Sequence, residues 1–179
     1  SDSSAQETDY TQYVNPFIGN AFTGHTFPGA TYPLGLVQPG PETGNYTWEY
    51  CAGYVYEDTH ITGFSQTRLN GTGCVDLGDL LMQPFSGDKR DDLRSEYDKT
   101  TEKASPGYYA VRLTDNDVNV EITAAPHVAF HKYTFAKGKP ANILADFQSG
   151  LTWTEDKVYR HILDNEITFE SDRVISGFT

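Results

Sequence analysis

The feature that most constrains the fold is a two-residue alternation of apolar and polar side chains in the second half of the chain. It runs over residues 108–113 and again over residues 118–123. A period of two is typical of a β-strand with one buried face. Asp115-Asn116-Asp117 lies between the two runs and has the composition of a hairpin turn. The sequence therefore predicts two half-buried strands joined as a hairpin.

Other short strands are predicted on both sides of this hairpin. They cover residues 80–84, 127–135, 142–147, 158–163, 166–170 and 173–178, with residues 158–170 forming a hairpin around Asp164-Asn165. No segment of ten or more residues has the apolar spacing of an amphipathic helix. The sequence predicts an all-β fold, either a sandwich or a barrel. Because the last strand ends the chain, we expect this edge of the domain to be incomplete.

The first part of the chain is punctuated by glycine, proline and aromatic residues. Residues 1–12 are predicted to be a disordered leader, and they resemble the start of a mature protein after an export signal has been removed. The domain itself is predicted to span residues 13–179. Residues 42–56 place Trp48 and three tyrosines on one face of an expected strand. Such aromatic side chains either are buried or stack on sugar rings, and both alternatives stay open.

A polar, glycine-rich loop is predicted over residues 63–78, where four glycines disfavour both helix and strand. Gln66, Arg68 and Asn70 alternate within it, so in an extended segment they would point the same way. Two amides and a guanidinium are suited to binding hydroxyl groups. The alternative is a structural turn with a solvated edge. His25, in an earlier glycine-rich loop, is likewise either a core-edge histidine or a site residue.

Charge and composition exclude several kinds of partner. The formal net charge of −12 argues against nucleic acid and anionic membranes, and no apolar run is long enough to span a membrane. Cys51 and Cys74 could form a disulfide or remain two thiols. Asp76 and Asp79 give only a weak indication of a cation site. Taken alone, the residues predict a β domain with a polar loop and nearby aromatics, without a catalytic constellation.

Several short motifs, taken together, resemble one family: the N-terminal domain of glycoside hydrolase family 92, the calcium-dependent exo-acting α-mannosidases. The matching stretches are Val14–Gly19, Gly24–Ala30, Gly53–Tyr56, Gly63–Ser65 with Leu69–Cys74, Asp76–Asp79, Ala104–Tyr109, Glu121–Ala124 and His131–Phe135. They occur in the order in which the family has them.

The resemblance implies an antiparallel β-sandwich packed on a C-terminal helical (α/α)6 barrel, with the active site between the two. It implies that the catalytic acid, the base and most calcium ligands belong to the helical domain. This chain alone is then expected to be inactive and to bind no calcium. In a secreted or periplasmic bacterial α-mannosidase, it would contribute substrate-binding residues and a domain interface. A non-catalytic carbohydrate-binding or scaffolding sandwich is the alternative.

The resemblance also implies roles for individual residues. His25 matches a family histidine, and Trp48 stands where the family often has a tryptophan that contacts the leaving-side sugar. The loop departs from the family's Ser-His-Thr-His-Leu-Ser-Gly, because Gln66, Arg68 and Asn70 replace the two histidines and the serine. The charge of Arg68 leads to the hypothesis that the substrate is a charged glycan, such as a mannose-phosphate linkage.

Overall fold

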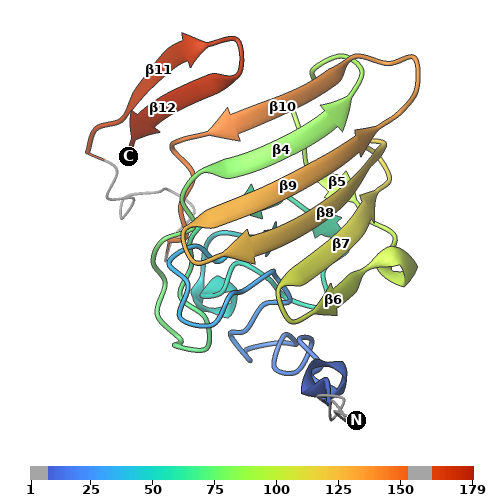
Figure 1. Cartoon of the computed structure of the whole chain (residues 1–179), viewed down its shortest axis with the longest axis vertical. Helices are drawn as coiled ribbons and strands as arrows, with labels where there is room; N and C mark the ends of the chain where they lie inside the picture. Colours follow the sequence, from blue (N-terminus) through green and yellow to red (C-terminus); the bar gives the residue numbers. More distant parts are fainter. Residues whose placement is uncertain (1–7, 153–162) are drawn as a thin grey trace, which may run out of the picture.

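The computed structural model describes residues 8–152 and 163–179, and within them the fold is built from strands and three short 3-10 helices (Figure 1). The strands are β1 (Gly40–Glu42), β2 (His60–Ile61), β3 (Gly63–Ser65), β4 (Leu81–Ser86), β5 (Ser95–Glu96), β6 (Lys103–Ser105), β7 (Tyr108–Leu113), β8 (Val118–Ala125), β9 (Val128–Phe135), β10 (Ala141–Asp146), β11 (Glu166–Ser171) and β12 (Val174–Phe178). The 3-10 helices are η1 (Tyr10–Tyr13), η2 (Trp48–Tyr50) and η3 (Lys99–Thr101). The predicted all-β fold is confirmed.

The strands form two four-stranded sheets and two short pairs, and every strand pairing within them is antiparallel. One sheet has the order β1-β3-β4-β10 and the other the order β6-β7-β8-β9; β2 pairs with β5, and β11 with β12. This is the antiparallel arrangement expected of a β-sandwich. The N-terminal loops, blue to teal in Figure 1, gather near one end of the strands.

The core lies against β7 and β8, whose inward side chains alternate as the sequence predicts. Val111 faces Val120 across the register, and Tyr109 faces Ile122. All four are at most 3% exposed, and Tyr109 packs against Phe64 of β3 with ring centroids 6.5 Å apart. Burying such side chains provides about 1.5–3 kcal/mol each. The hairpin over residues 108–123 is thus confirmed, and it contributes the main apolar face of the domain.

A buried carboxylate fixes the segment after η2 onto β7. Glu102, whose side chain is 2% exposed, accepts hydrogen bonds from the hydroxyls of Tyr54 and Tyr109 at 2.8–3.1 Å. The ammonium of Lys99 lies 3.5 Å from the same carboxylate and 4.2 Å from the centre of the Tyr56 ring. Burial, followed by the charge of Glu102, raises the pKa of Tyr54 and of Tyr109. Both hydroxyls therefore stay protonated as donors.

The prediction of a strand over residues 42–56 is wrong for most of that range. Strand β1 ends at Glu42, and Trp48 lies in η2 instead of on a strand face. Thr47 has a φ of 72°, which takes the backbone out of the extended region immediately before Trp48. The parity argument therefore does not hold here. Trp48, Tyr50, Tyr54 and Tyr56 do not share a strand face, and Tyr54 is buried.

The glycine-rich loop also begins later than predicted, because Gly63–Ser65 forms β3. It pairs with β1 over three residues and with β4 at Phe64–Met82. A Cβ on Gly63 would come within 2.8 Å of the Leu81 side chain, so glycine is required for this close approach. The ladder hydrogen bonds and the burial of Phe64 outweigh the entropic cost of the glycine.

Two predictions at the ends of the chain fall partly outside the described residues. Of the predicted leader, residues 1–7 lie outside the described residues, but Tyr10–Tyr13 forms a 3-10 helix because the Asp9 side chain accepts from the backbone N–H of Thr11. Near the C-terminus, Glu166–Ser171 pairs with Val174–Phe178 across a turn at residues 172–173. The hairpin predicted around Asp164-Asn165 has most of its first strand outside the described residues.

Candidate functional site

Three loops that are far apart in the sequence meet around Trp48. The indole N–H of Trp48 donates to the carbonyl of Gly73 at 3.0 Å. The His25 ring stands edge-on to the Trp48 ring, with centroids 4.3 Å apart and planes at 81°. The N–H of Gly71 donates to the carbonyl of His25 at 2.6 Å. These contacts bring the first glycine-rich loop, η2 and the central loop into one cluster.

His25 combines a left-handed backbone conformation with a buried ring nitrogen that has no hydrogen-bond partner among the described residues. Its φ is 56°, in the left-handed region that non-glycine residues rarely adopt. The side chain is 7% exposed, and its Nε2 is buried without a hydrogen-bond partner in the part of the chain that the structure describes. A buried polar atom left unpaired costs about 1–3 kcal/mol, so each such atom needs an explanation, and a bound ligand, an ion or an ordered water can supply one. Strain and an unpaired atom coincide in the same residue.

The rim of this cluster presents an apolar ring and small polar groups. Trp48 is 46% exposed, and Asn70 and Thr72 are exposed as well. A groove of about 740 Å³ lies beside Asn70 and Thr72, and it is also lined by Thr26, Phe27, Arg68 and residues 14–16 and 31–35. An aromatic face with amide and hydroxyl groups beside it is suited to a polyhydroxylated ligand.

Arg68 points into the domain, away from the face where hydroxyl binding was expected. It is 2% exposed. Its Nη1 donates to the carbonyls of Ala52 and Pro41 at 2.5 and 3.2 Å, and its Nη2 donates to the carbonyl of Gly40 and the hydroxyl of Ser65 at 2.9 and 2.6 Å. The guanidinium also lies 4.1 Å from the centre of the Phe27 ring. The hypothesis of a charged glycan loses its basis, because this charge is held by the protein itself.

The charge on Arg68 persists in spite of its burial. Burial lowers its pKa to about 10, and Glu42, which is fully buried nearby, acts in the opposite direction. Both side chains approach Gly53, where a Cβ would lie 3.1 Å from Nη1 of Arg68 and 3.1 Å from Cγ of Glu42. At neutral pH the guanidinium therefore remains a cation that cross-links β1, β3 and the segment after η2.

Gln66 is also engaged within the domain. Its Nε2 donates to the carbonyl of Phe64 at 2.9 Å, which leaves its Oε1 as the acceptor for Nε2 of His131 at 2.8 Å. Nδ1 of His131 then accepts from the hydroxyl of Tyr133 at 2.9 Å. This chain requires a neutral His131, and burial lowers its pKa to about 4. Gln66 thus connects the start of the central loop to β9.

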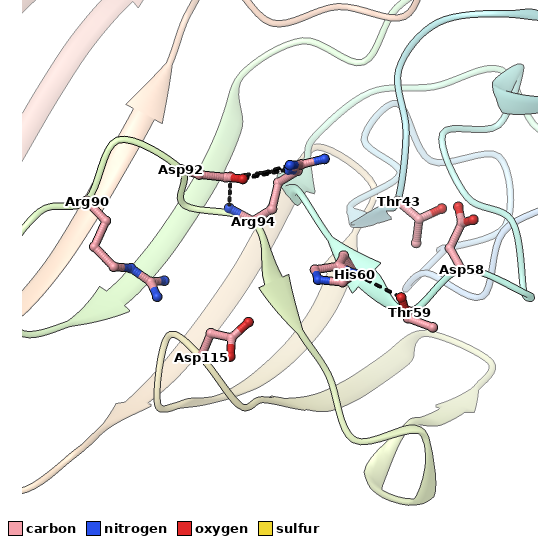
Figure 2. Close-up of a pocket in the computed structure, with 8 residues that line it drawn as sticks. All are labelled: Thr43, Asp58, Thr59, His60, Arg90, Asp92, Arg94 and Asp115. Carbon is pink, nitrogen blue, oxygen red and sulfur yellow. Dashed lines mark hydrogen bonds and ion pairs between the residues drawn. The ribbon is translucent and has the colours of Figure 1, made fainter.

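A second, more polar pocket lies on another part of the domain (Figure 2). It encloses about 460 Å³ and is lined by Thr43, Asp58, Thr59, His60, Arg90, Asp92, Arg94 and Asp115. Its side chains already have partners: Arg94 pairs with Asp92 at 2.7 Å, and Nδ1 of His60 is 2.8 Å from the hydroxyl of Thr59. Because each of these groups is satisfied internally, the pocket offers a weaker case for a ligand than the cluster around His25.

The family resemblance implies that most calcium ligands lie outside this chain. Calcium takes six to eight oxygen ligands. Within residues 8–152 and 163–179, no three His, Cys, Asp or Glu side chains gather as metal ligands would. Asp79 accepts from the hydroxyl of Thr67 at 2.6 Å, and Asp76 from the N–H of Leu77 at 2.8 Å.

The structure thus divides the five predicted site residues into two groups. His25, Trp48 and Asn70 lie at the exposed cluster, whereas Gln66 and Arg68 support it from within. Sequence reasoning missed Gly73, whose φ is 67° and where a Cβ would lie 3.3 Å from Nδ1 of His25. It also missed Glu49, an exposed acid whose pKa is lowered mainly by the Thr47 hydroxyl and slightly by His25. Gly73 lies within the stretch Leu69–Cys74 that carries the family resemblance, whereas Glu49 has no signal in the sequence beyond its closeness to Trp48.

Comparison with known proteins gives a consistent result. A family profile described as the glycosyl hydrolase family 92 N-terminal domain matches residues 13–179. An uncharacterized secreted glycosidase from Arthroderma benhamiae is 31% identical over 160 residues, which are 78% of this chain and 20% of that protein.

Two solved structures show the same fold. A family 92 α-mannosidase from Bacteroides thetaiotaomicron, in complex with mannoimidazole, has a TM-score of 0.76 and 37% identity over 80% of this chain. An inverting mannosidase of the same family and organism has a TM-score of 0.65 and 22% identity over 80% of this chain. The chain spans about a fifth of the length of each of these relatives. Among the described residues, no helix is long and apolar enough to cross a membrane.

Replacing Arg68 with lysine is expected to lower the free energy of unfolding by about 2–4 kcal/mol, because an ammonium cannot satisfy four oxygens arranged around a planar fork. Arg94→Lys is the matched control. Its exposed pair with Asp92 is expected to contribute less than about 1 kcal/mol. Urea denaturation monitored by tryptophan fluorescence would measure both. Equal effects of the two substitutions would contradict the role assigned to Arg68.

The buried, neutral His131 predicts a pH-dependent stability. Its folded pKa is about 4, against 6.5 for an ordinary histidine, so the unfolded chain takes up the proton first. Its contribution to stability is fully present above pH 6.5 and is lost progressively between about pH 6.5 and pH 4. His131→Gln should flatten this part of the stability profile. His127→Gln, at an exposed position, should leave it unchanged. A profile with the same slope in all three proteins would refute the prediction.

Proposed function

The chain belongs to glycosyl hydrolase family 92 as its N-terminal domain, and on this premise we propose that it forms the sugar-binding side of an exo-α-mannosidase. The enzyme would hydrolyse terminal α-mannose from mannose-containing glycans with inversion at the anomeric carbon. The observation that carries this proposal is the buried Nε2 of His25, which has no hydrogen-bond partner among the described residues, beside the half-exposed ring of Trp48.

His25 and Trp48 contribute different interactions to a sugar. The Trp48 ring presents an apolar face of the kind on which the C–H faces of a pyranose stack. Its only donor is already used by the Gly73 carbonyl, so the ring contributes contact area and no further hydrogen bond. His25 supplies a single hydrogen-bonding atom whose pairing with a hydroxyl would remove its desolvation cost. Asn70, exposed at the rim, adds an amide for a second hydroxyl.

Gln66 and Arg68 are proposed to act as positioning residues. Arg68 fixes the bases of the loops through carbonyls of β1 and of the segment after η2. Gln66 holds the start of the central loop against His131. Substituting either residue is therefore expected to change the geometry of His25, Trp48 and Asn70 without removing a direct contact to the sugar.

The catalytic acid, the base and the calcium ligands are proposed to come from a C-terminal helical domain, as the family resemblance implies. Exposed apolar side chains on the N-terminal loops support an interface of this kind beside the groove. They are Ile18, Phe22, Leu34 and Leu36, each at least 73% exposed. Exposed apolar side chains mark an interaction surface where they gather into a patch. An interface here would place the helical domain over the cluster around His25.

We also propose that the enzyme is exported from a bacterial cell. The relative from Arthroderma benhamiae is described as secreted, and the solved relatives come from a bacterium. The net charge of −12 suits a solvated protein outside the cytoplasm as well as inside it, so it does not decide the matter.

Substitutions at the two central residues test the proposal. In the full-length protein, His25→Asn and Trp48→Ala are each expected to lower kcat/KM for an α-mannoside by about tenfold or more, which corresponds to about 1.4 kcal/mol of lost transition-state binding. Asparagine tolerates the left-handed backbone at position 25, so the loop is preserved. Phe130→Ala, which removes an exposed aromatic ring from β9, is the control. Release of mannose would be measured.

The outcomes distinguish the alternatives. No mannose release by the full-length protein, together with calorimetric binding of mannose or mannobiose, would favour a non-catalytic carbohydrate-binding domain. Neither release nor binding would overturn the proposal. Unchanged kcat/KM in both variants would show that the sugar site lies elsewhere.

A pair of glycine substitutions separates backbone strain from contact with His25. Gly71 and Gly73 have similar φ values, 76° and 67°, so an alanine is strained at either position. A Cβ at 71 would meet only a methyl group of Thr26 at 4.0 Å, whereas a Cβ at 73 would press on His25 at 3.3 Å and approach Trp48 at 3.7 Å. Gly73→Ala is therefore expected to weaken mannoside affinity several-fold more than Gly71→Ala. Equal losses, measured by calorimetry, would contradict the proposed place of His25.

A further inference from the structure

The two cysteines of the chain lie on either side of Trp48. The thiol of Cys51 donates to the carbonyl of Trp48 at 2.9 Å, and the backbone N–H of Cys51 donates to the same oxygen at 3.3 Å. On its other side, the indole N–H of Trp48 reaches the carbonyl of Gly73, the residue before Cys74. Trp48 therefore makes hydrogen bonds with Cys51 itself and with the residue next to Cys74.

The thiols are also close enough to influence each other electrostatically. Burial raises the pKa of the Cys51 thiol, and the nearby Cys74 raises it further. In the structure both are free thiols, Cys51 buried and Cys74 exposed. This combination gives one accessible thiol that can meet an oxidant and one buried thiol.

The loop that carries Cys74 has the conformational freedom that closure requires. A disulfide needs Cα atoms about 4.4–6.8 Å apart and a particular orientation of the Cβ atoms. Cys74 follows two glycines with positive φ, Gly71 and Gly73, and its backbone N–H is held only by the hydroxyl of Thr72 at 3.2 Å. Glycine at these two positions gives the backbone before Cys74 more accessible conformations than another residue would.

We propose that Cys51 and Cys74 are a disulfide site, and that their oxidation fastens the central loop to the turn that carries Trp48. The bond would reinforce the contact between Trp48 and Gly73 that already exists. Nothing in this inference requires the domain to bind a sugar, so it can be tested whether or not the proposed function holds.

The reaction is a thiol–disulfide exchange with a disulfide donor, such as oxidised glutathione or an oxidoreductase of an oxidising compartment. The Cys74 thiolate attacks the donor, forms a mixed disulfide and displaces one donor thiolate, which takes up a proton. The Cys51 thiolate then attacks the Cys74 sulfur, forms the intramolecular bond and releases the second donor thiol. Two protein thiols are oxidised and one donor disulfide is reduced. Because burial raises the pKa of Cys51, the second step is expected to be slow and to accelerate as the pH rises.

The test is peptide mapping of the full-length protein after incubation in a redox buffer of reduced and oxidised glutathione, followed by alkylation of the remaining thiols. The expected result is a peptide pair joined through Cys51 and Cys74. The oxidised protein should also melt at a temperature roughly 5 °C or more above that of the reduced protein, because the cross-link restricts the unfolded chain. Reduction should remove both signals.

The variant Cys74→Ser is the matched control, because it alters only an exposed side chain. It should show the melting temperature of the reduced protein in either redox state. Three outcomes would overturn the inference: alkylation of Cys74 after oxidation, a glutathione adduct on Cys74 that is never resolved by Cys51, or a cross-link between two molecules through Cys74. A cross-linked peptide without any rise in melting temperature would refute the fastening role.

Discussion

The guanidinium of Arg68 is a charge held inside the domain, and the segments around it supply acceptors for its two terminal nitrogens. A buried charge costs several kcal/mol unless it is paired and hydrogen-bonded. Here three backbone carbonyls and one hydroxyl accept from it, the Phe27 ring covers one face, and Glu42 supplies negative charge. These acceptors belong to β1, β3 and the segment after η2. Moving any one of these acceptors away would leave an N–H of the buried guanidinium without a hydrogen bond. The positions of the three segments relative to one another are therefore strongly specified.

Loops that are fixed at their bases can be strained at their tips. His25, Thr47 and Gly73 all have φ between 56° and 72°, and they come from three different loops of the same cluster. Each non-glycine residue in this region costs on the order of 1 kcal/mol or more, and it persists only where the surroundings over-determine it. The strain at His25 and Thr47 adds to the unpaired Nε2 of His25. Arg68, Gln66 and the tyrosines bound to Glu102 supply the rigidity that permits this local instability.

The sequence predicts the second half of the fold well because one face of each strand there is buried. The alternation at residues 108–123 survives in the structure as the buried face of β7 and β8. The same parity rule fails for residues 42–56 and 66–70, because it holds only while the backbone stays extended. Thr47 leaves the extended region, and residue 68 makes only an isolated bridge to Leu77. The nearby sequence could not predict that the Arg68 side chain points inward, because only the complete fold brings its acceptors at residues 40, 41 and 52 close to it. His25 and Trp48 were indicated by family resemblance, and their contact with each other by the structure alone.

The form of the cluster limits what this domain can contribute to catalysis. The only donor of Trp48 is used by Gly73, so its ring offers an apolar face, and His25 offers one unpaired ring nitrogen. An apolar face with one directional contact can fix the orientation of a pyranose. Contacts of this kind bind the substrate equally well in the ground state and in the transition state. They accelerate a reaction only by holding the substrate in place for the groups that act on the bond being broken. Inverting hydrolysis requires two carboxyl groups about 6.5–9.5 Å apart around the anomeric carbon. Within the proposed function, a domain that supplies these carboxyl groups would lie on the side where Trp48, Asn70 and Thr72 are exposed.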